Sequence, residues 1–200
     1  MIETGITVLR FGDRRLPHAL ASLPCFQPDE PTWIDTAIQD ARRVVVVGSD
    51  ADLAAVLTRL MRAERLDIEV AHVLGWRGAR GAVNGVAHRV PLIRDDTATA
   101  LVGTAWWLPP EGFRAIRGEA VVDDAVLFDG DAGGVRIEPT AAMPGLRATV
   151  RGRGPRRWLA GRAVQLGTTG ARVVRDGVEG PREVKRSTFY RHTTGWLRVG

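Results

Sequence analysis

The strongest candidate for chemistry is the turn Gly48-Ser49-Asp50-Ala51-Asp52, which follows four valines and precedes an apolar stripe at helical spacing. A glycine between a buried strand and a helix lets the backbone approach a ligand, and the free N–H groups of a helix start attract an anion. The same residues also fit a capping box, in which the side chains of Ser49 and Asp52 each accept a hydrogen bond from the other residue's backbone N–H. The turn therefore predicts either a phosphate site or a capped strand-to-helix junction.

The turn contains two carboxylates, Asp50 and Asp52, whose negative charges affect its affinity for a phosphate. They stabilise the helix dipole without any ligand, and they would repel a phosphate unless a metal ion bridged the charges. Asp50 is the candidate metal ligand. The sequence contains neither a G-x-x-x-x-G-K-[ST] loop nor a G-x-G-x-x-G motif, so no standard phosphate-binding pattern supports the first alternative.

A second candidate is the glycine-rich stretch from Gly75 to Gly85. It follows a predicted strand over residues 67–74, and open α/β sheets bind their ligands beyond the carboxyl ends of parallel strands. Arg77 and Arg80 could each pair with phosphate oxygens through a guanidinium fork, and Asn84 adds a further polar group. The alternative is a solvated connector. His72, inside the apolar strand, is interpreted as a core residue rather than a ligand.

Over the first half of the chain, the spacing of apolar residues alternates between patterns typical of strands and patterns typical of helices. Strand-like runs at residues 6–11, 44–47 and 67–74 are separated by helical patterns at 32–43 and 53–61. Short apolar strands alternating with amphipathic helices predict a βαβαβ unit with a parallel sheet, and Val44–Val47 should be one of its interior strands.

From about residue 117 the pattern changes to short extended runs between Gly, Pro and Asp-Gly turns. Asp129-Gly130 and Asp176-Gly177 predict hairpins, and no long helical pattern occurs there. Residues 101–113, which contain Trp106-Trp107 and a Pro-Pro pair, are interpreted as a linker or an inter-domain contact. The predicted fold class is α/β plus β, with a nucleotide-binding-like α/β domain over residues 1–112 and a mainly antiparallel β domain over residues 113–200.

Composition narrows the class of partner. The 200 residues carry a net charge of +5, almost all the positive charge is arginine, and Lys185 is the only lysine. This balance favours anionic partners such as phosphates, nucleic acid or acidic lipid surfaces. No apolar run is long enough to span a membrane, no signal peptide is visible, and the lone Cys25 has no partner for an internal disulfide. We expect a cytoplasmic protein, or one peripheral to the inner membrane surface.

Residues 44–60 resemble the nucleotide-binding stretch of the diacylglycerol kinases and their NAD-kinase relatives. In that family a strand leads into Gly-Gly-Asp-Gly-Thr and then into a helix with an apolar start. Gly48, Asp50 and Leu53 match the motif. Ser49, Ala51 and Asp52 stand where the family has glycine, glycine and threonine. The resemblance implies the α/β-then-β order and, where the motif is intact, ATP with Mg²⁺ and phosphoryl transfer.

A later segment, residues 171–186, is similar to the family's Asp-Gly-Glu region: Asp176 and Gly177 match, and Val178 is inserted before Glu179. The family's Gly-Thr-x-Asn-Asp segment is absent after the third strand. Phosphoryl transfer depends on positioning of the phosphate groups and on stabilisation of their charge by metal ions. These departures from the family motifs therefore predict weakened catalysis.

The sequence thus predicts a non-catalytic or regulatory kinase-like protein that binds a nucleotide or phospholipid headgroup. Its candidate binding residues are Gly48, Ser49, Asp50, Asp52, Arg77, Arg80 and Asn84, with Asp50 as the metal ligand. An active ATP- and Mg²⁺-dependent lipid or small-molecule kinase is the first alternative. A basic nucleic-acid- or partner-binding module is the second, and a homo-oligomer is compatible with all three. Without kinase activity we expect no cofactor.

Overall fold

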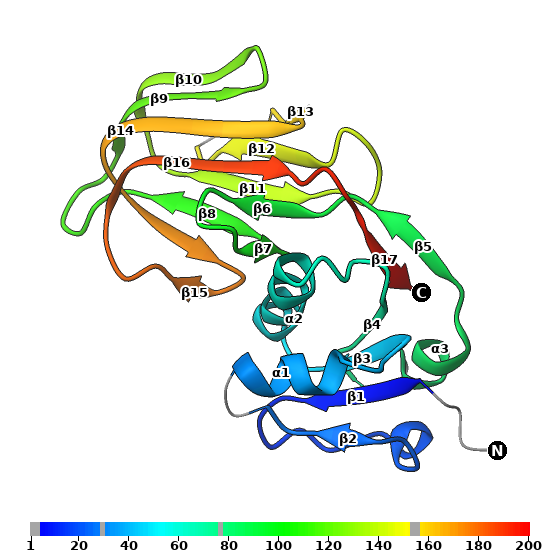
Figure 1. Cartoon of the computed structure of the whole chain (residues 1–200). Helices are drawn as coiled ribbons and strands as arrows, with labels where there is room; N and C mark the ends of the chain where they lie inside the picture. The colour runs from blue at the N-terminus through cyan, green and yellow to red at the C-terminus, as the bar shows by residue number, and fades with distance from the viewer. Residues whose placement is uncertain (1–4, 29–30, 76–77, 153–156) are drawn as a thin grey trace. The chain divides into compact units, whose positions relative to one another are not determined.

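The computed structural model describes residues 5–28, 31–75, 78–152 and 157–200, and its internal contacts divide the chain into two compact units. The first unit holds residues 1–90 and 194–200, and the second holds residues 91–193 (Figure 1). The boundary expected after residue 112 differs from this division, which groups residues 91–112 with the second unit. It also returns residues 194–200 to the first.

A six-stranded sheet forms the centre of the first unit, in the order β2-β1-β3-β4-β17-β5. All neighbours are parallel except β17 and β5, which pair antiparallel. The elements are β1 (Ile6–Arg10), η1 (His18–Leu20), β2 (Cys25–Phe26), α1 (Pro31–Ile38), β3 (Arg43–Val47), α2 (Asp50–Arg62), β4 (Glu69–Val73), α3 (Ala79–Asn84), β5 (Ala87–Val90) and β17 (Trp196–Val199).

Strand β3 lies between β1 and β4 and is buried along its whole length. Val45 and Val47 pack in one cluster with Ala79 and Ala82 of α3, so the alternate valines face the opposite side of the sheet. Helices α1 and α2 contact β1 and β3, respectively, and each other. This arrangement confirms the prediction of an interior parallel strand at residues 44–47.

The second unit is a large, mostly antiparallel sheet whose longest path is β13-β12-β11-β8-β14-β16-β6-β7. Strand β14 also pairs with β9 and β15, and β9 pairs with β10. Its strands are β6 (Ile93–Asp95), β7 (Ala100–Leu101), β8 (Ala105–Leu108), β9 (Ile116–Val122), β10 (Ala125–Ala132), β11 (Val135–Pro139), β12 (Leu146–Val150), β13 (Leu159–Gly161), β14 (Ala163–Arg175), β15 (Val178–Glu179) and β16 (Val184–Arg191).

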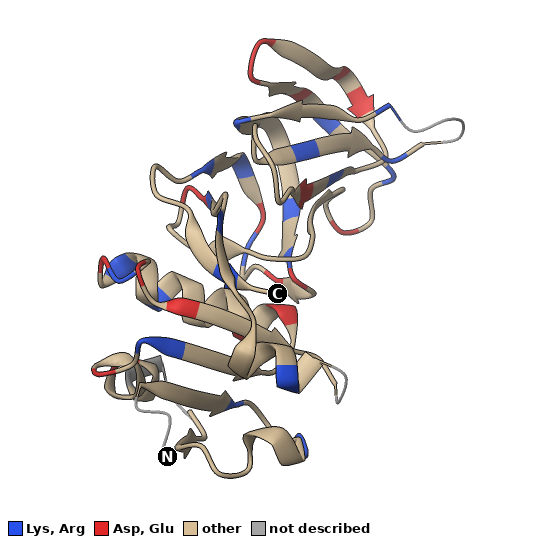
Figure 2. Cartoon of the chain, turned by 90° about the vertical axis from the view of Figure 1, so that its right-hand side faces the viewer, with Lys and Arg blue, Asp and Glu red and all other residues tan. Residues whose placement is uncertain are grey.

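The β-rich character predicted for the later part of the chain is confirmed, because the described residues beyond 116 form strands and no helix. One predicted turn is right: Asp176 and Gly177 have φ of 48° and 85° and join β14 to β15. The other is wrong. Gly130 lies inside β10 opposite Gly118, and the chain turns instead at Asp123, whose φ is 48°. The acidic residues of this β9–β10 hairpin are red at the top of Figure 2.

The expected linker at residues 101–113 is also wrong in part, because β8 is a central strand of the second sheet. The Trp107 side chain is fully buried, and its indole Nε1 donates a hydrogen bond of 2.9 Å to the Ser187 hydroxyl. A buried indole N–H requires an acceptor, so Ser187 has a structural role here. Its hydroxyl is committed to that bond, in agreement with the absence of a hydrolase motif around it.

Candidate functional site

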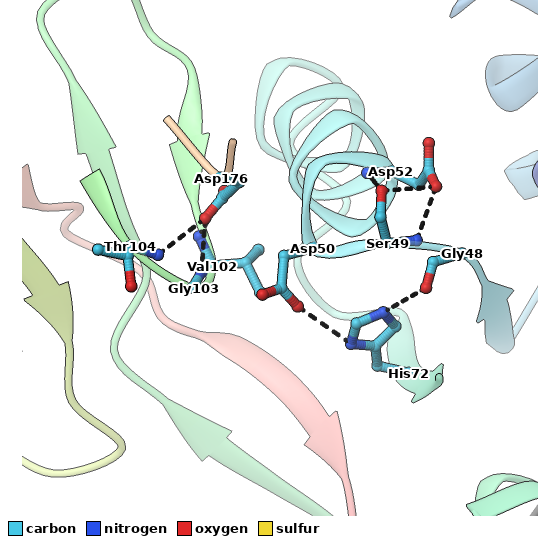
Figure 3. A network of polar contacts seen from close by, with 9 residues as sticks. All are labelled: Gly48, Ser49, Asp50, Asp52, His72, Val102, Gly103, Thr104 and Asp176. Carbon is cyan, nitrogen blue, oxygen red and sulfur yellow. Dashed lines mark hydrogen bonds and ion pairs between the residues drawn. The ribbon is translucent and has the colours of Figure 1, made fainter. Parts of the chain in front are cut away.

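The turn between β3 and α2 is a complete capping box (Figure 3). Asp52 folds back so that its Oδ2 accepts from the Ser49 backbone N–H at 2.7 Å and from the Ser49 hydroxyl at 2.8 Å. The Ser49 Oγ in turn accepts from the Asp52 N–H at 3.3 Å. The turn therefore satisfies the Ser49 and Asp52 N–H groups with its own side chains, as the capping alternative predicted.

Removing the cap should be measurable. In the Ser49→Ala variant the Asp52 N–H loses its acceptor, and we expect the free energy of unfolding to fall by about 1 kcal/mol. Urea unfolding followed by circular dichroism would measure the change. Ser49→Thr, which keeps a hydroxyl, is the control and should lose much less. Equal losses in the two variants would contradict the cap.

Gly48 is required for close approach rather than for an unusual backbone angle. A Cβ atom at this position would lie 2.7 Å from both the Cβ and the Oδ2 of Asp52, closer than such atoms pack. The capping box and the glycine are therefore one structural unit, because any larger residue would push Asp52 away from Ser49.

His72 is a neighbour of this turn that sequence reasoning missed. It pairs in register with Val46 on the adjacent parallel strand, and its side chain is mostly buried, with 16% exposed. Its Nε2 lies 3.1 Å from the Gly48 carbonyl oxygen, and its Nδ1 lies 3.9 Å from Asp50 Oδ1. A carbonyl can only accept, so Nε2 carries the proton and Nδ1 faces the Asp50 carboxylate. The signal in the sequence was a polar residue, His72, within the apolar run at residues 70–74.

A pocket of about 440 Å³ lies at the carboxyl ends of β1 and β3. It is lined by the segment that follows β1 and by Asp52 from the start of α2; the residues are Phe11, Gly12, Asp13, Arg14 and Asp52. The Phe11 N–H donates to the Val47 carbonyl at 3.0 Å, which holds the two strand ends together.

This pocket sits at the point where the strand order reverses. The chain leaves β1 toward β2 on one side and leaves β3 toward β4 on the other. Open α/β sheets bind ligands at such switch points, beyond the carboxyl ends of the strands. The segment Gly12–Arg14 was not singled out from the sequence, although it follows a predicted strand and carries both charge signs.

The second candidate, Gly75–Gly85, is a short helix for most of its described length and not a loop, because α3 spans Ala79–Asn84. Arg80 and Asn84 are exposed on it. Among the described residues, no hydrogen bond or ion pair joins either side chain to the Gly48 turn. Arg77 lies outside the described residues. The structure therefore brings Gly48, Ser49, Asp50 and Asp52 together and leaves Arg80 and Asn84 apart from them.

In the second unit, the Asp176 carboxylate accepts three backbone N–H groups, from Val102 at 3.0 Å, Gly103 at 2.7 Å and Thr104 at 3.0 Å (Figure 3). Its own N–H donates to the Thr104 carbonyl at 2.9 Å. The matched acidic residue of the later motif thus anchors the β14–β15 turn. Glu179, beyond the inserted Val178, pairs with Arg172 at 3.1 Å.

Asp50 is the carboxylate of the Gly48 turn that could take part in holding a metal ion. Across the described ranges, no three His, Cys, Asp or Glu side chains are grouped closely enough to hold a metal. Asp50 offers one carboxylate that is about half exposed, at 45%. Mg²⁺ commonly uses one or two carboxylates and completes its shell with phosphate oxygens and water. The donor set therefore fits a metal carried in by a phosphate ligand.

Comparisons with known proteins agree on the fold. No family model and no curated protein matches the sequence. A diacylglycerol kinase from Bacillus anthracis str. Sterne is similar in structure, with a TM-score of 0.74, 10% identity and coverage of 98% of this chain and 96% of that chain. An NAD kinase from Archaeoglobus fulgidus in complex with ATP has a TM-score of 0.66 at 12% identity, covering 98% and 93% of the two chains.

Yeast NADH kinase complexed with NADH is also similar, with a TM-score of 0.61 at 8% identity and coverage of 99% of this chain and 84% of that chain. The chain therefore has the fold shared by diacylglycerol kinases and NAD kinases, as the resemblance in the Gly48 stretch implied. Among the described residues, no helix is both long and apolar enough to cross a membrane.

Proposed function

We propose that this chain binds a phosphate-bearing ligand, either a nucleotide or a phospholipid headgroup, at the carboxyl edge of the first sheet without efficient phosphoryl transfer. The capping box is the observation that carries this proposal. The Asp52 carboxylate occupies the Ser49 N–H at 2.7 Å and the Ser49 hydroxyl at 2.8 Å, two donors that would otherwise be open to a phosphate at the helix start. A turn that satisfies its own donors holds a phosphate poorly and positions it loosely.

The pocket beside the turn supports ligand binding. Its lining includes the exposed, positively charged Arg14, together with the carboxyl residues Asp13 and Asp52, whose charge a divalent ion would have to offset for a phosphate to bind. An arginine can pair with a phosphate through two parallel N–H bonds. The neighbours in complex with ATP and with NADH make a nucleotide the first ligand to test. The diacylglycerol kinase neighbour makes a phospholipid headgroup the second.

An active kinase is the second candidate function, and Asp50 is the observation that favours it. Its carboxylate is free of the capping box and half exposed, and it keeps the place of the acidic residue in the family motif. When bound there with a nucleotide, Mg²⁺ would neutralise phosphate charge. The chain's own part would be to present Asp50 from the first turn of α2, beside the His72 ring at 3.9 Å.

Thermal unfolding in the presence of ligands tests both functions. ATP and glycerol 3-phosphate, each with and without Mg²⁺, stand for the two ligand sources. A ligand that binds only the folded state at 100 times its Kd adds about 2.7 kcal/mol of stability and raises the melting temperature. We expect at least one of the two ligands, at millimolar concentration, to raise it. No shift with either ligand would overturn the proposal.

The metal-dependent part of any shift should require Asp50. We expect Asp50→Asn to abolish the difference between ATP with and without Mg²⁺, because an amide oxygen is a weaker Mg²⁺ ligand than a carboxylate. Asp40→Asn, which changes an exposed carboxylate after α1, is the matched control and should leave the shift unchanged. Transfer or release of the ATP terminal phosphate that disappears in Asp50→Asn would favour the active kinase instead.

The remaining predictions stand beside this proposal. A cytoplasmic location, or a peripheral one at the inner membrane surface, stays a prediction, and so does a homo-oligomer. A nucleic-acid-binding function rests on the net charge of +5 alone. Spread charge is typical of a solvated surface, so it supports this alternative less than the pocket supports a phosphate ligand.

A further inference from the structure

The second unit has a pocket of its own, of about 460 Å³, where β9 runs between β10 and the middle of β14. Glu119 of β9 stands opposite Asp129 of β10 on one side and opposite Gly167 of β14 on the other, and all three line the pocket. Directly opposite residues share one face of a sheet. The alternate residues Ala120 and Leu166 are buried in the core, so this pocket, which we call the Gly167 pocket, opens on the solvent face.

The lining of the Gly167 pocket contains a glycine that the fold does not require. Gly118 allows two strands to approach, because a Cβ there would lie 2.1 Å from the Gly167 carbonyl oxygen, and Gly130 has a φ of 105°. At Gly167 neither reason applies, because its φ lies outside the left-handed region and a Cβ there would meet no heavy atom within 4 Å. A glycine inside a strand weakens the strand and often marks a position where a ligand comes close.

The charged side chains around the pocket are of both signs and are left unpaired. Glu119 and Asp129 are like charges on directly opposite residues, an arrangement that costs stability unless a cation relieves it. Arg117 also lines the pocket, two residues before Glu119 on the same face of β9. Asp131 stands opposite Arg117 but does not line the pocket. Within the described part of the chain, none of these four side chains makes an ion pair or a side-chain hydrogen bond.

We propose that the Gly167 pocket binds a basic amino acid such as lysine or arginine. The pocket offers two carboxylates and one guanidinium, and a basic amino acid carries the reverse, two cationic groups and one carboxylate. Its carboxylate would pair with Arg117, and its cationic groups would lie against Glu119 and Asp129. Opposite residues have Cβ atoms about 4.5–5.5 Å apart, so one ammonium group can reach both acidic side chains. Small-ligand pockets have volumes of about 300–1,000 Å³, which includes this one.

Ligand-observed NMR on the full chain tests the proposal with L-lysine, with cadaverine, which lacks the carboxylate, and with L-glutamate, which reverses the balance of charge. We expect millimolar binding of L-lysine that weakens in high salt, because the charges are exposed. Cadaverine should bind about tenfold more weakly, since Arg117 then has no partner, and L-glutamate should not bind. Absence of L-lysine binding, or equal binding of L-lysine and either other probe, would overturn the proposal.

Gly167→Thr separates ligand binding from a structural role of the glycine. Threonine suits a strand and its Cβ meets nothing at this position, so the melting temperature should stay the same or rise. The same side chain would fill the pocket, so L-lysine binding should be lost. Undiminished binding would exclude this pocket as the site, and a lower melting temperature would show that the fold needs the glycine after all. Either result contradicts the proposal.

The charges can be tested separately. Glu119→Gln with Asp129→Asn should abolish L-lysine binding, and Arg117→Gln should reduce it to the level of cadaverine. Asp124→Asn, which changes an exposed carboxylate at the turn of the same hairpin, is the matched control and should leave binding unchanged. If the control has the same effect as the double change, net charge and not the pocket is responsible. Self-association that requires Glu119 and Asp129, without L-lysine binding, would instead assign the pocket to a second copy of the chain.

This proposal is independent of the ligand site at the Gly48 turn, because the Gly167 pocket lies in the second unit. Gly167→Thr should therefore leave any stabilisation by ATP unchanged. L-lysine binding without an effect of ATP would support this inference alone, and the reverse result would support only the proposed function.

Discussion

Replacing Arg43 with methionine should lower the free energy of unfolding by about 3–5 kcal/mol. This is a larger change than we expect from the other single substitutions. The Arg43 side chain is only 6% exposed, and its guanidinium pairs with Glu69 Oε2 at 2.6 Å. It also donates to three main-chain carbonyls at the end of α3, those of Ala82 at 3.1 Å, Val83, and Gly85 at 2.9 Å.

The loss would be large because methionine fills the space but donates nothing. The Glu69 carboxylate and the carbonyls at the end of α3 would then be left without their buried donor. Arg43 also helps to hold the end of α3 against the sheet, beside the packing of Ala79 and Ala82. Urea unfolding of the full chain, followed by tryptophan fluorescence, measures the change.

The neighbouring Arg42 supplies the control. It reaches the same Glu69 carboxylate at 3.8 Å, but its side chain is 65% exposed. Surface ion pairs contribute about 0–1 kcal/mol, so Arg42→Met should change stability little. If the two variants unfold at the same urea concentration, Arg43 does not anchor α3 in the way that its contacts indicate.

Bringing the turn closer to the family motif should strengthen nucleotide binding by up to about a hundredfold. The double change Ala51→Gly with Asp52→Thr removes the carboxylate that occupies the Ser49 donors. At about 5 Å and an effective dielectric near 20, one such charge repels a phosphate charge by roughly 3 kcal/mol. The helix dipole returns only about 0.3–1 kcal/mol, so repulsion dominates in the unaltered turn. A gain of about 1.4 kcal/mol corresponds to tenfold in Kd.

The same change should cost stability, which separates it from a nonspecific effect. Asp52 is the acidic partner of the capping box, and its loss should cost about 1 kcal/mol. Ala51 lies in the first turn of α2, where glycine is less favourable by about 1 kcal/mol. Titration calorimetry with ATP and Mg²⁺ should show tighter binding to a less stable protein. Micromolar affinity in the unaltered chain would contradict our interpretation of the turn.

These two predictions address different requirements of the first unit. The Arg43 anchor concerns the framework, because it ties the end of one helix to an interior strand. The Gly48 turn concerns chemistry, because its donors are available either to Asp52 or to a ligand but not to both.

Much of the local structure followed from the sequence alone. The four valines predicted a strand buried on both faces, and Ser49 with Asp52 predicted the cap as one of two alternatives for the turn, because both patterns depend on residues close together in the sequence. The change to β structure beyond residue 116 was equally local, since short runs between turn residues form strands. Asp129-Gly130 shows the limit of such signals: a turn-forming pair was absorbed into β10 by pairing with β9.

Only the tertiary structure decided which distant residues meet. Strand β17 joins the first sheet beside β4, through a pairing of Leu197 with Glu69 that no local pattern encodes. Arg43 likewise reaches the Gly85 carbonyl, 42 residues further along the chain. His72 joins the Gly48 turn because parallel pairing aligns it with Val46. Sequence periodicity specifies which face of a strand is apolar, but strand order and register are fixed by the packing of the whole sheet.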